Sequence, residues 1–218
     1  DRWNQRKVPK TEEEWQEVER RGAAGLAGNT TTHYDFITPE YQVFDSQQPV
    51  KWECTRGIGR SFGFNRTECG SDYLNGAQII DMLVRIVSRG GNLLLNIGPR
   101  ADGTVPYEQV KPLLETGEWL RVNGEAIYGT RPHSTLEYKD ADGCSVCMTK
   151  ARDALYAIAL RPDMPASYEV KGLMLEENAH VELLGAGEVQ WFAEEDCTVF
   201  NLPENLPKQA AYTLKIHR

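Results

Sequence analysis

The spacing of apolar residues between positions 72 and 97 predicts a helix followed by a strand. From residue 72 to 88, apolar side chains recur every three or four positions and form one face of a helix, which glycines 90 and 91 end. The apolar positions of this face are Ile79, Ile80, Leu83, Val84, Ile86 and Val87. Residues 92–97 (NLLLNI) then form a short apolar run bounded by glycine and proline, as expected for a strand buried on both faces. A helix that leads into a buried strand is typical of an α/β fold.

Two further helices are predicted on either side of this unit. Pro106 suits the first turn of a helix, and the apolar pattern after it continues to residues 123–124. Thr11 and Glu14 have the spacing of a capping box, which predicts a helix that runs to about Arg21. The charged stretch around this helix separates residue 3 from residue 34, and we expect it to form a surface insertion.

The pattern changes near residue 131, where short apolar runs begin to follow one another at intervals of about ten residues. Several of these runs alternate, and Asp, Gly, Pro and Asn turns separate them. The runs are Leu136–Tyr138, Ser145–Thr149, Leu155–Leu160, Ser167–Val170, Val181–Leu184, Glu188–Phe192, Thr198–Leu202 and Tyr212–Ile216. This spacing predicts an antiparallel β-sandwich. We therefore predict two units, residues 1–131 and residues 132–218.

Composition narrows the classes of partner. The net charge of -8 over 218 residues argues against nucleic acid, because no basic stripe is present to neutralise phosphates. No run of about 18 apolar residues exists, so we predict no membrane span. The five cysteines include one CxxC pair, Cys144 and Cys147, but no second pair follows to complete a zinc site. We expect these cysteines to be structural and no metal to be bound.

Residues 33–65 combine aromatic rings, carboxylates and arginines with glycines and a proline. A sugar site needs this mixture, because flat apolar faces and charged hydrogen-bonding groups must meet on a backbone that turns sharply. The same composition is also typical of a packed loop without catalytic function. The segment is therefore a candidate site, and composition leaves both interpretations open.

Several segments resemble one known family in the same order along the chain. These are residues 35–41 (DFITPEY), 52–53 (WE), 61–65 (SFGFN), 88–104 (SRGGNLLLNIGPRADGT) and 119–130 (WLRVNGEAIYGT). The opening residues 1–3 (DRW) resemble the end of a further motif of that family. Together they resemble the alpha-L-fucosidases of glycoside hydrolase family 29, over about residues 1–131. The resemblance implies a (β/α) barrel followed by a C-terminal sandwich, in agreement with the pattern above.

The resemblance also implies a catalytic role for Glu40. A retaining glycosidase uses two carboxyl groups about 5 Å apart, one to attack the anomeric carbon and one to protonate the departing oxygen. Glu40 corresponds to the second group, the acid and base. The aromatic residues Tyr34, Phe36 and Tyr41 could keep its surroundings dry, and Pro39 stiffens the approach. The alternative, on the residues alone, is an ordinary solvent-facing glutamate on a strand.

Two residues are implied to bind substrate. Arg2 matches an arginine that contacts the sugar near the nucleophile, and Phe62 matches an aromatic residue that lines the fucose pocket. Without the resemblance, Arg2 would be a solvated side chain near the chain end and Phe62 a core residue. Trp52, Glu53 and Arg56 are more typical of the supporting wall of a barrel.

The family's nucleophilic aspartate and fucose-binding histidines are implied to lie before the first residue of this chain. A complete (β/α)8 barrel takes about 250 residues, so residues 1–131 correspond to its C-terminal half. We therefore expect a fold of class α/β plus β, in which the C-terminal half of a (β/α)8-type barrel precedes an antiparallel β-sandwich. The expected partners are the missing N-terminal half of the barrel and a fucosylated glycan substrate.

The function implied is that of a retaining exo-glycosidase that hydrolyses terminal alpha-L-fucosyl linkages without a cofactor, in a periplasmic, secreted or lysosomal location. The isolated fragment is expected to be inactive. One alternative is a non-catalytic carbohydrate-binding or scaffolding fragment, which calorimetry with fucose would reveal as binding without turnover. A second alternative is another retaining glycosidase on a related barrel, which a panel of aryl glycosides would identify.

Overall fold

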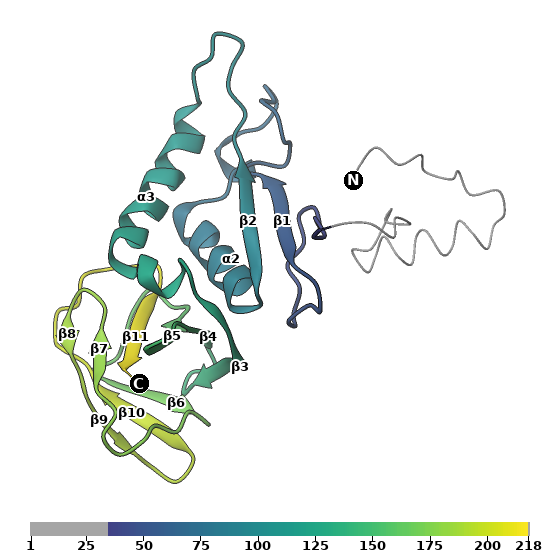
Figure 1. Cartoon of the computed structure of the whole chain (residues 1–218). Coiled ribbons are helices and arrows are strands. Elements are labelled where there is room, and N and C mark those ends of the chain that lie inside the picture. The colour runs from purple at the N-terminus through teal and green to yellow at the C-terminus, as the bar shows by residue number, and fades with distance from the viewer. Residues whose placement is uncertain (1–34, 218) are drawn as a thin grey trace.

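The computed structural model describes residues 35–217, which form an α/β unit and a β unit (Figure 1). In the α/β unit, β1 (Trp52–Gly57) and β2 (Gly91–Asn96) pair in parallel along their whole length. The helix α2 (Gly76–Ser88) connects the two strands. Its apolar side packs against both of them, in a buried cluster that contains Trp52, Cys54, Met82 and Ile86. The predicted helix-to-strand alternation is therefore confirmed.

The helix ends follow from local hydrogen bonds. Asn75 caps α2, because its side chain accepts a hydrogen bond from the Gln78 amide (2.9 Å) while the Gln78 side chain accepts one from the Asn75 amide (2.9 Å). The helix therefore begins later than residue 72, and the short 3-10 helix η1 (Gly70–Asp72) precedes it. Pro106 stands at the N-cap of α3 (Tyr107–Asn123), as the sequence predicts, and the 3-10 helix η2 (Gly124–Ala126) follows.

The expectation that β2 is buried on both faces is wrong for the described residues. Leu93 and Leu95 pack towards the cluster beneath α2, but Leu94 is 46% exposed. Successive side chains of a strand point to opposite faces, and only the helix-covered face of this pair is packed. The open face is the one that would line the inside of a barrel.

The β unit is a nine-stranded antiparallel sheet with the order β8-β7-β11-β5-β4-β3-β6-β10-β9. Its strands are β3 (Arg131–Asp140), β4 (Ser145–Lys150), β5 (Ala154–Ala159), β6 (Ser167–Lys171), β7 (Val181–Leu183), β8 (Gly187–Glu188), β9 (Gln190–Ala193), β10 (Cys197–Asn201) and β11 (Tyr212–His217). Every run that the sequence predicts as a strand overlaps one of these. The antiparallel β unit is therefore confirmed.

The sequence predicts a sandwich, which would have two separate sheets. The hydrogen bonds instead join all nine strands into one curled sheet. The reason lies in β3, which pairs with β4 on one side and with β6 on the other and changes register between Pro132 and Glu137. This irregularity bends the sheet while hydrogen bonding continues past the bend. The edge strands β8 and β9 are separated in the chain by Val189 alone, so the sheet is nearly closed around its core.

A shared core joins the two units. Ile80 and Val84 of α2 and Trp119 of α3 pack in one buried cluster with residues of β4 and β5, among them Cys147 and Tyr156. The Trp119 indole N–H donates to the Ala211 carbonyl (2.8 Å), which ties α3 to the start of β11. The helix α2, which covers the strands of the α/β unit, and α3, which packs on α2, therefore also cover one face of the β unit.

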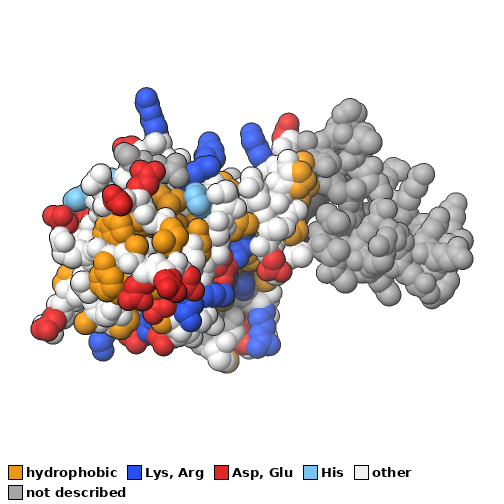
Figure 2. All heavy atoms as spheres, turned by 90° about the horizontal axis from the view of Figure 1, so that it is seen from below, with side chains coloured by type: hydrophobic (Ala, Val, Ile, Leu, Met, Phe, Trp, Pro, Cys, Tyr) orange, Lys and Arg blue, Asp and Glu red, His pale blue; other side chains and the backbone are white. Residues whose placement is uncertain are grey.

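Figure 2 shows the face of the β unit seen from below, where hydrophobic side chains gather and acidic side chains border them. Of the helices among residues 35–217, none is both long enough and apolar enough to cross a bilayer. The predicted helix near residues 11–21 lies outside the described residues.

Candidate active site

Residues 37–41 extend the parallel pair by a third strand-like segment. The Ile37 amide donates to the Lys51 carbonyl (3.0 Å), and the Tyr41 amide donates to the Thr55 carbonyl (3.1 Å). Parallel bridges pair Ile37 with Trp52 and Glu40 with Thr55. The carboxyl ends of this segment, β1 and β2 consequently lie along one edge. Ligand sites of parallel α/β sheets and barrels form at this edge.

Glu40 lies at this carboxyl edge, and its side chain is exposed. The preceding Pro39 is buried, and its carbonyl accepts a hydrogen bond from the Thr55 amide (3.0 Å), so the backbone that carries Glu40 is held against β1. Phe36 and Tyr41, which we expected to exclude water, are 45% and 40% exposed. A dry environment for the Glu40 carboxyl therefore requires polypeptide beyond the described residues.

Tyr41 anchors the segment immediately after Glu40. Its backbone has a φ of 55°, in the left-handed region that bulky residues rarely adopt. The Tyr41 hydroxyl accepts a hydrogen bond from the Gly57 amide (3.1 Å) and donates one to the Arg60 carbonyl (3.0 Å). The sequence suggested only a water-excluding role for Tyr41. The strained backbone and these two bonds show that it also fixes the path of the chain beside Glu40.

Phe62 lies next to this anchor. Its ring meets the Tyr41 ring edge-on, with the centroids 5.3 Å apart, and its carbonyl accepts a hydrogen bond from the Asn96 side chain (2.5 Å). The Arg56 guanidinium lies over the Tyr41 ring, 4.9 Å from the centroid. The structure thus brings Glu40 and Phe62 to the same edge through Tyr41. Arg56 also belongs to this group, which its predicted role in a barrel wall did not suggest.

The loop that carries Phe62 crosses the carboxyl ends of both strands. The Ile58 amide donates to the Asn96 carbonyl (2.9 Å), which places the loop over the end of β2. Gly98 permits this arrangement, because a Cβ there would collide with the backbone of Gly63 and Phe64. The Gly98 amide also donates to the buried side chain of Gln109 on α3 (2.8 Å). A motif glycine therefore allows the loop backbone to pass close to the residues after β2.

The remaining predicted residues have distinct positions. Trp52 is buried, its indole N–H donates to the Arg89 carbonyl (3.3 Å), and its ring contacts that of Phe44, which agrees with a supporting role in the wall. Glu53 is half-buried on β1. Arg2 lies outside the described residues, so its contact with a sugar remains a prediction.

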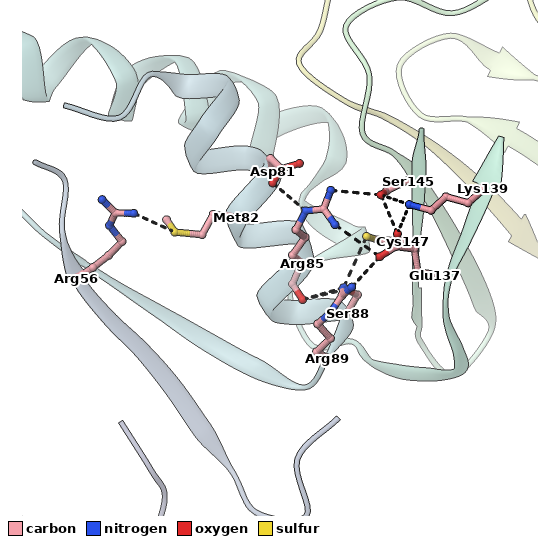
Figure 3. Close-up of polar contacts among 10 residues, drawn as sticks. All are labelled: Arg56, Asp81, Met82, Arg85, Ser88, Arg89, Glu137, Lys139, Ser145 and Cys147. Atoms are coloured by element: carbon pink, nitrogen blue, oxygen red, sulfur yellow. Dashed lines mark hydrogen bonds and ion pairs between the residues drawn. The ribbon is translucent and has the colours of Figure 1, made fainter. Parts of the chain in front are cut away.

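A charged cluster connects α2 to the β unit (Figure 3). The Arg89 guanidinium, which is buried, donates to the Glu137 carboxylate of β3 (2.7 Å) and to the Asp45 carbonyl (3.3 Å). Lys139 and Ser145 donate to the other Glu137 oxygen (2.7 and 2.8 Å). Burial alone would raise the pKa of Glu137, but these hydrogen bonds outweigh it and lower the pKa from 4.5 to about 2. Sequence reasoning missed this cluster, because its members are distant in the chain.

No group of three or more His, Cys, Asp and Glu side chains within residues 35–217 is arranged to hold a metal ion. All five cysteines have free thiols, and burial raises the pKa of the Cys147 thiol. Neither of two hollows of the described surface is lined by Glu40 or Phe62. One, of about 450 Å³, lies between the first turns of α2 and the β unit, and Arg56 of the candidate site lines part of it. The other, of about 540 Å³, lies on the β unit.

Comparison with known proteins identifies the family. The sequence profile of the family "Alpha-L-fucosidase" matches residues 2–125. Human tissue alpha-L-fucosidase is 34% identical over 173 residues, which cover 76% of this chain and 37% of the relative. Alpha-L-fucosidase of Dictyostelium discoideum is 47% identical over 85 residues, which cover 39% of this chain and 18% of the relative.

The solved structure of Thermotoga maritima alpha-fucosidase in complex with a mechanism-based inhibitor matches with a TM-score of 0.80 and 31% identity, over 94% of this chain and 48% of that one. The same enzyme in complex with fucose matches with a TM-score of 0.77 and 30% identity, over 93% of this chain and 48% of that one. The chain thus spans about half the length of these structures and a smaller share of the curated relatives. The profile match and the shared fold show that this chain belongs to the alpha-L-fucosidase family.

Proposed function

We propose that the complete protein is a retaining exo-alpha-L-fucosidase that releases terminal fucose from glycans. In this proposal, residues 1–131 are the C-terminal portion of a catalytic (β/α) barrel, and residues 132–218 are a C-terminal β domain. Family membership supports the substrate class, and the similar Thermotoga enzyme has been solved with fucose bound. The open face of β1 and β2, with Leu94 half-exposed, agrees with a barrel completed by further polypeptide.

The catalytic step assigned to this chain is proton transfer by Glu40. The Glu40 carboxylic acid donates its proton to the glycosidic oxygen as the C–O bond breaks, while a carboxylate from polypeptide outside this chain attacks the anomeric carbon. Glu40 then takes a proton from the water that hydrolyses the glycosyl-enzyme. The single observation that carries this proposal is the position of Glu40 at the carboxyl edge of the parallel strands, beside the anchored Tyr41.

Phe62 and Arg2 complete the substrate contacts in this proposal. The Phe62 ring offers an apolar surface to the C6 methyl group of fucose, and its place against Tyr41 keeps that surface close to Glu40. Arg2 would orient a hydroxyl or the partner carboxylate with its guanidinium.

The test is Glu40→Gln in the full-length protein, assayed with fucosides of poor and good leaving groups. General acid catalysis contributes about 10²–10⁴-fold, so turnover of the poor-leaving-group substrate should fall by that factor. The good leaving group needs less protonation, and added azide should restore part of its turnover by replacing the base-activated water. Unchanged hydrolysis of both substrates would disprove the role of Glu40.

Glu53→Gln is the matched control. Glu53 lies on β1, the strand that pairs with the segment that carries Glu40, but it is assigned no catalytic step. We expect its turnover to stay near that of the unmodified protein. The alternative of a non-catalytic carbohydrate-binding fragment is tested by calorimetry of residues 1–218 with fucose. Binding of fucose by this chain alone, together with an inactive full-length protein, would favour that alternative.

A further inference from the structure

The hollow of about 540 Å³ on the β unit lies where the curled sheet nearly closes. Segment 175–181 forms one side, and the edge strands β8 and β9 form the other. The Trp191 indole N–H donates to the Ala179 carbonyl (2.8 Å), and the Val189 amide donates to the Val181 carbonyl (2.9 Å). These bonds fix the two sides relative to each other. The groove is therefore formed before any ligand binds, and its volume is within the range of small-molecule sites.

The groove has an apolar floor and a polar rim. Val181 and Val189 of the floor are buried in the core of the β unit, and Trp191 packs against the same core. On the rim, the Phe192 ring is 45% exposed, and Gln190 contributes a side-chain amide. An exposed aromatic ring beside a groove that also offers several hydrogen-bonding groups has the composition of a small-molecule site.

The charges on the rim restrict the ligand. Glu177 and Glu188 supply two carboxylates, and Asn178 a second amide, whereas the residues that line the groove include neither lysine nor arginine. His180 lies 3.7 Å from the Glu188 carboxylate, and its ring meets that of His217 at an angle of 59° with the centroids 4.8 Å apart, so its ring is also held in place. An anionic ligand such as a phosphate or a nucleic acid is disfavoured here. A neutral ligand with many hydroxyl groups is favoured, because carboxylates and amides accept and donate hydrogen bonds in several directions.

Aromatic rings beside such groups favour a sugar. A pyranose presents an apolar C–H face, which packs on an aromatic ring, and an edge of hydroxyls, which the rim can bind. We propose that this groove is a second, non-catalytic site for neutral oligosaccharide. Binding at the groove does not depend on the proposed function, but the benefit of such binding does. A fucosidase that acts on branched glycans would hold its substrate at a higher local concentration through this site. In Figure 1, β8 and β9 lie on the side of the β unit away from β1, so the groove is separate from the Glu40 site.

The binding test uses the full-length protein and a neutral, fucose-free, biantennary N-acetyllactosamine oligosaccharide, followed by ligand-observed NMR and calorimetry. The absence of fucose keeps the probe from serving as a substrate. Phe192→Ala should weaken binding about tenfold, whereas Tyr128→Ala, which removes an exposed ring outside the groove, should not change it. No binding by the unmodified protein, or equal binding by both variants, would overturn the proposal.

The kinetic test separates the groove from the catalytic site. Phe192→Ala should leave hydrolysis of a small aryl fucoside unchanged but raise KM several-fold for a fucosylated glycoprotein. A parallel loss on both substrates would mean a structural role and would overturn the proposal. Concentration-dependent self-association that Phe192→Ala abolishes would instead assign the groove to a second copy of the chain. If the unmodified protein hydrolyses no fucoside, the proposed function fails, yet the binding test still decides on the groove.

Discussion

Replacing Glu137 by glutamine should destabilise the protein in a pH-dependent way. The lowering of the Glu137 pKa from 4.5 to about 2 corresponds to about 3 kcal/mol of stability at neutral pH. Because a fifth of the side chain is exposed (20%), solvent screening reduces this to about 2 kcal/mol. Glu137→Gln also leaves the buried Arg89 guanidinium without its carboxylate, which adds to the cost. We expect a total loss of about 2–3 kcal/mol at pH 7.

The pH dependence has a definite sign. The folded-state pKa of Glu137 is below the unfolded value, so its contribution is complete above about pH 4.5 and disappears as the pH falls towards 2. The stability difference between the unmodified protein and Glu137→Gln should therefore be largest at pH 6–7 and shrink by pH 3.

The assay is urea unfolding of the full-length protein between pH 7 and pH 3, followed by tryptophan fluorescence. Glu204→Gln is the control, because Glu204 is an exposed glutamate of the same unit, and its effect should stay within about 0.5 kcal/mol. A double-mutant cycle with Arg89→Met should give a coupling of about 1 kcal/mol or more. A stability loss that is the same at pH 7 and pH 3 would refute the role of the lowered Glu137 pKa in stability. A coupling near zero would refute the contribution of Arg89 to it.

Three further substitutions test the packing of the candidate site and of the unit boundary. Gly98→Ala should cost about 1–3 kcal/mol and lower kcat, because the new methyl group displaces the backbone at Phe64; thermal unfolding and fucoside turnover would measure both. Tyr41→Phe should cost about 1 kcal/mol and lower kcat, since two hydrogen bonds of the Tyr41 hydroxyl are lost while its ring remains; a variant with unchanged kcat would show that this anchor does not position the site. Trp119→Phe should cost about 1–3 kcal/mol in urea unfolding, because it removes the indole donor to the Ala211 carbonyl and part of a buried ring; a cost near zero would contradict the described contact.

Within residues 35–217, local sequence patterns were sufficient to predict the long helices and the strands of the β unit but not their ends. The apolar face of α2 follows from a spacing of three and four residues, yet its start depends on Asn75 and Gln78. The spacing of Asn75 and Gln78 is that of a capping box and can be recognised in the sequence. The apolar pattern alone placed the helix start earlier. The left-handed backbone of Tyr41 has no comparable signal, because tertiary contacts impose it on a residue that does not favour it.

The candidate site shows a similar division. Motif resemblance selected Glu40 and Phe62, and the structure places both at one strand edge. The sequence did not suggest that Arg56 lies over the Tyr41 ring. The alternation of side chains along a strand predicts which face a side chain occupies but not which ring it contacts. The curled single sheet was equally hidden, since runs spaced by ten residues fit a sandwich and a nearly closed sheet alike.

The contacts of Arg89 indicate that the β unit supports the candidate site. The Arg89 guanidinium donates to the Asp45 carbonyl, five residues after Glu40, and the Arg89 carbonyl accepts the indole N–H of Trp52 on β1. A buried guanidinium is stable in this position only if a carboxylate compensates its charge, and Glu137 of β3 supplies that carboxylate. The Arg89 guanidinium therefore holds the chain at Asp45, shortly after Glu40, and a carboxylate of the β unit balances its charge. This dependence gives a physical reason for the α/β unit and the β unit to occur in one polypeptide, because the buried Arg89 guanidinium would have no carboxylate partner without β3.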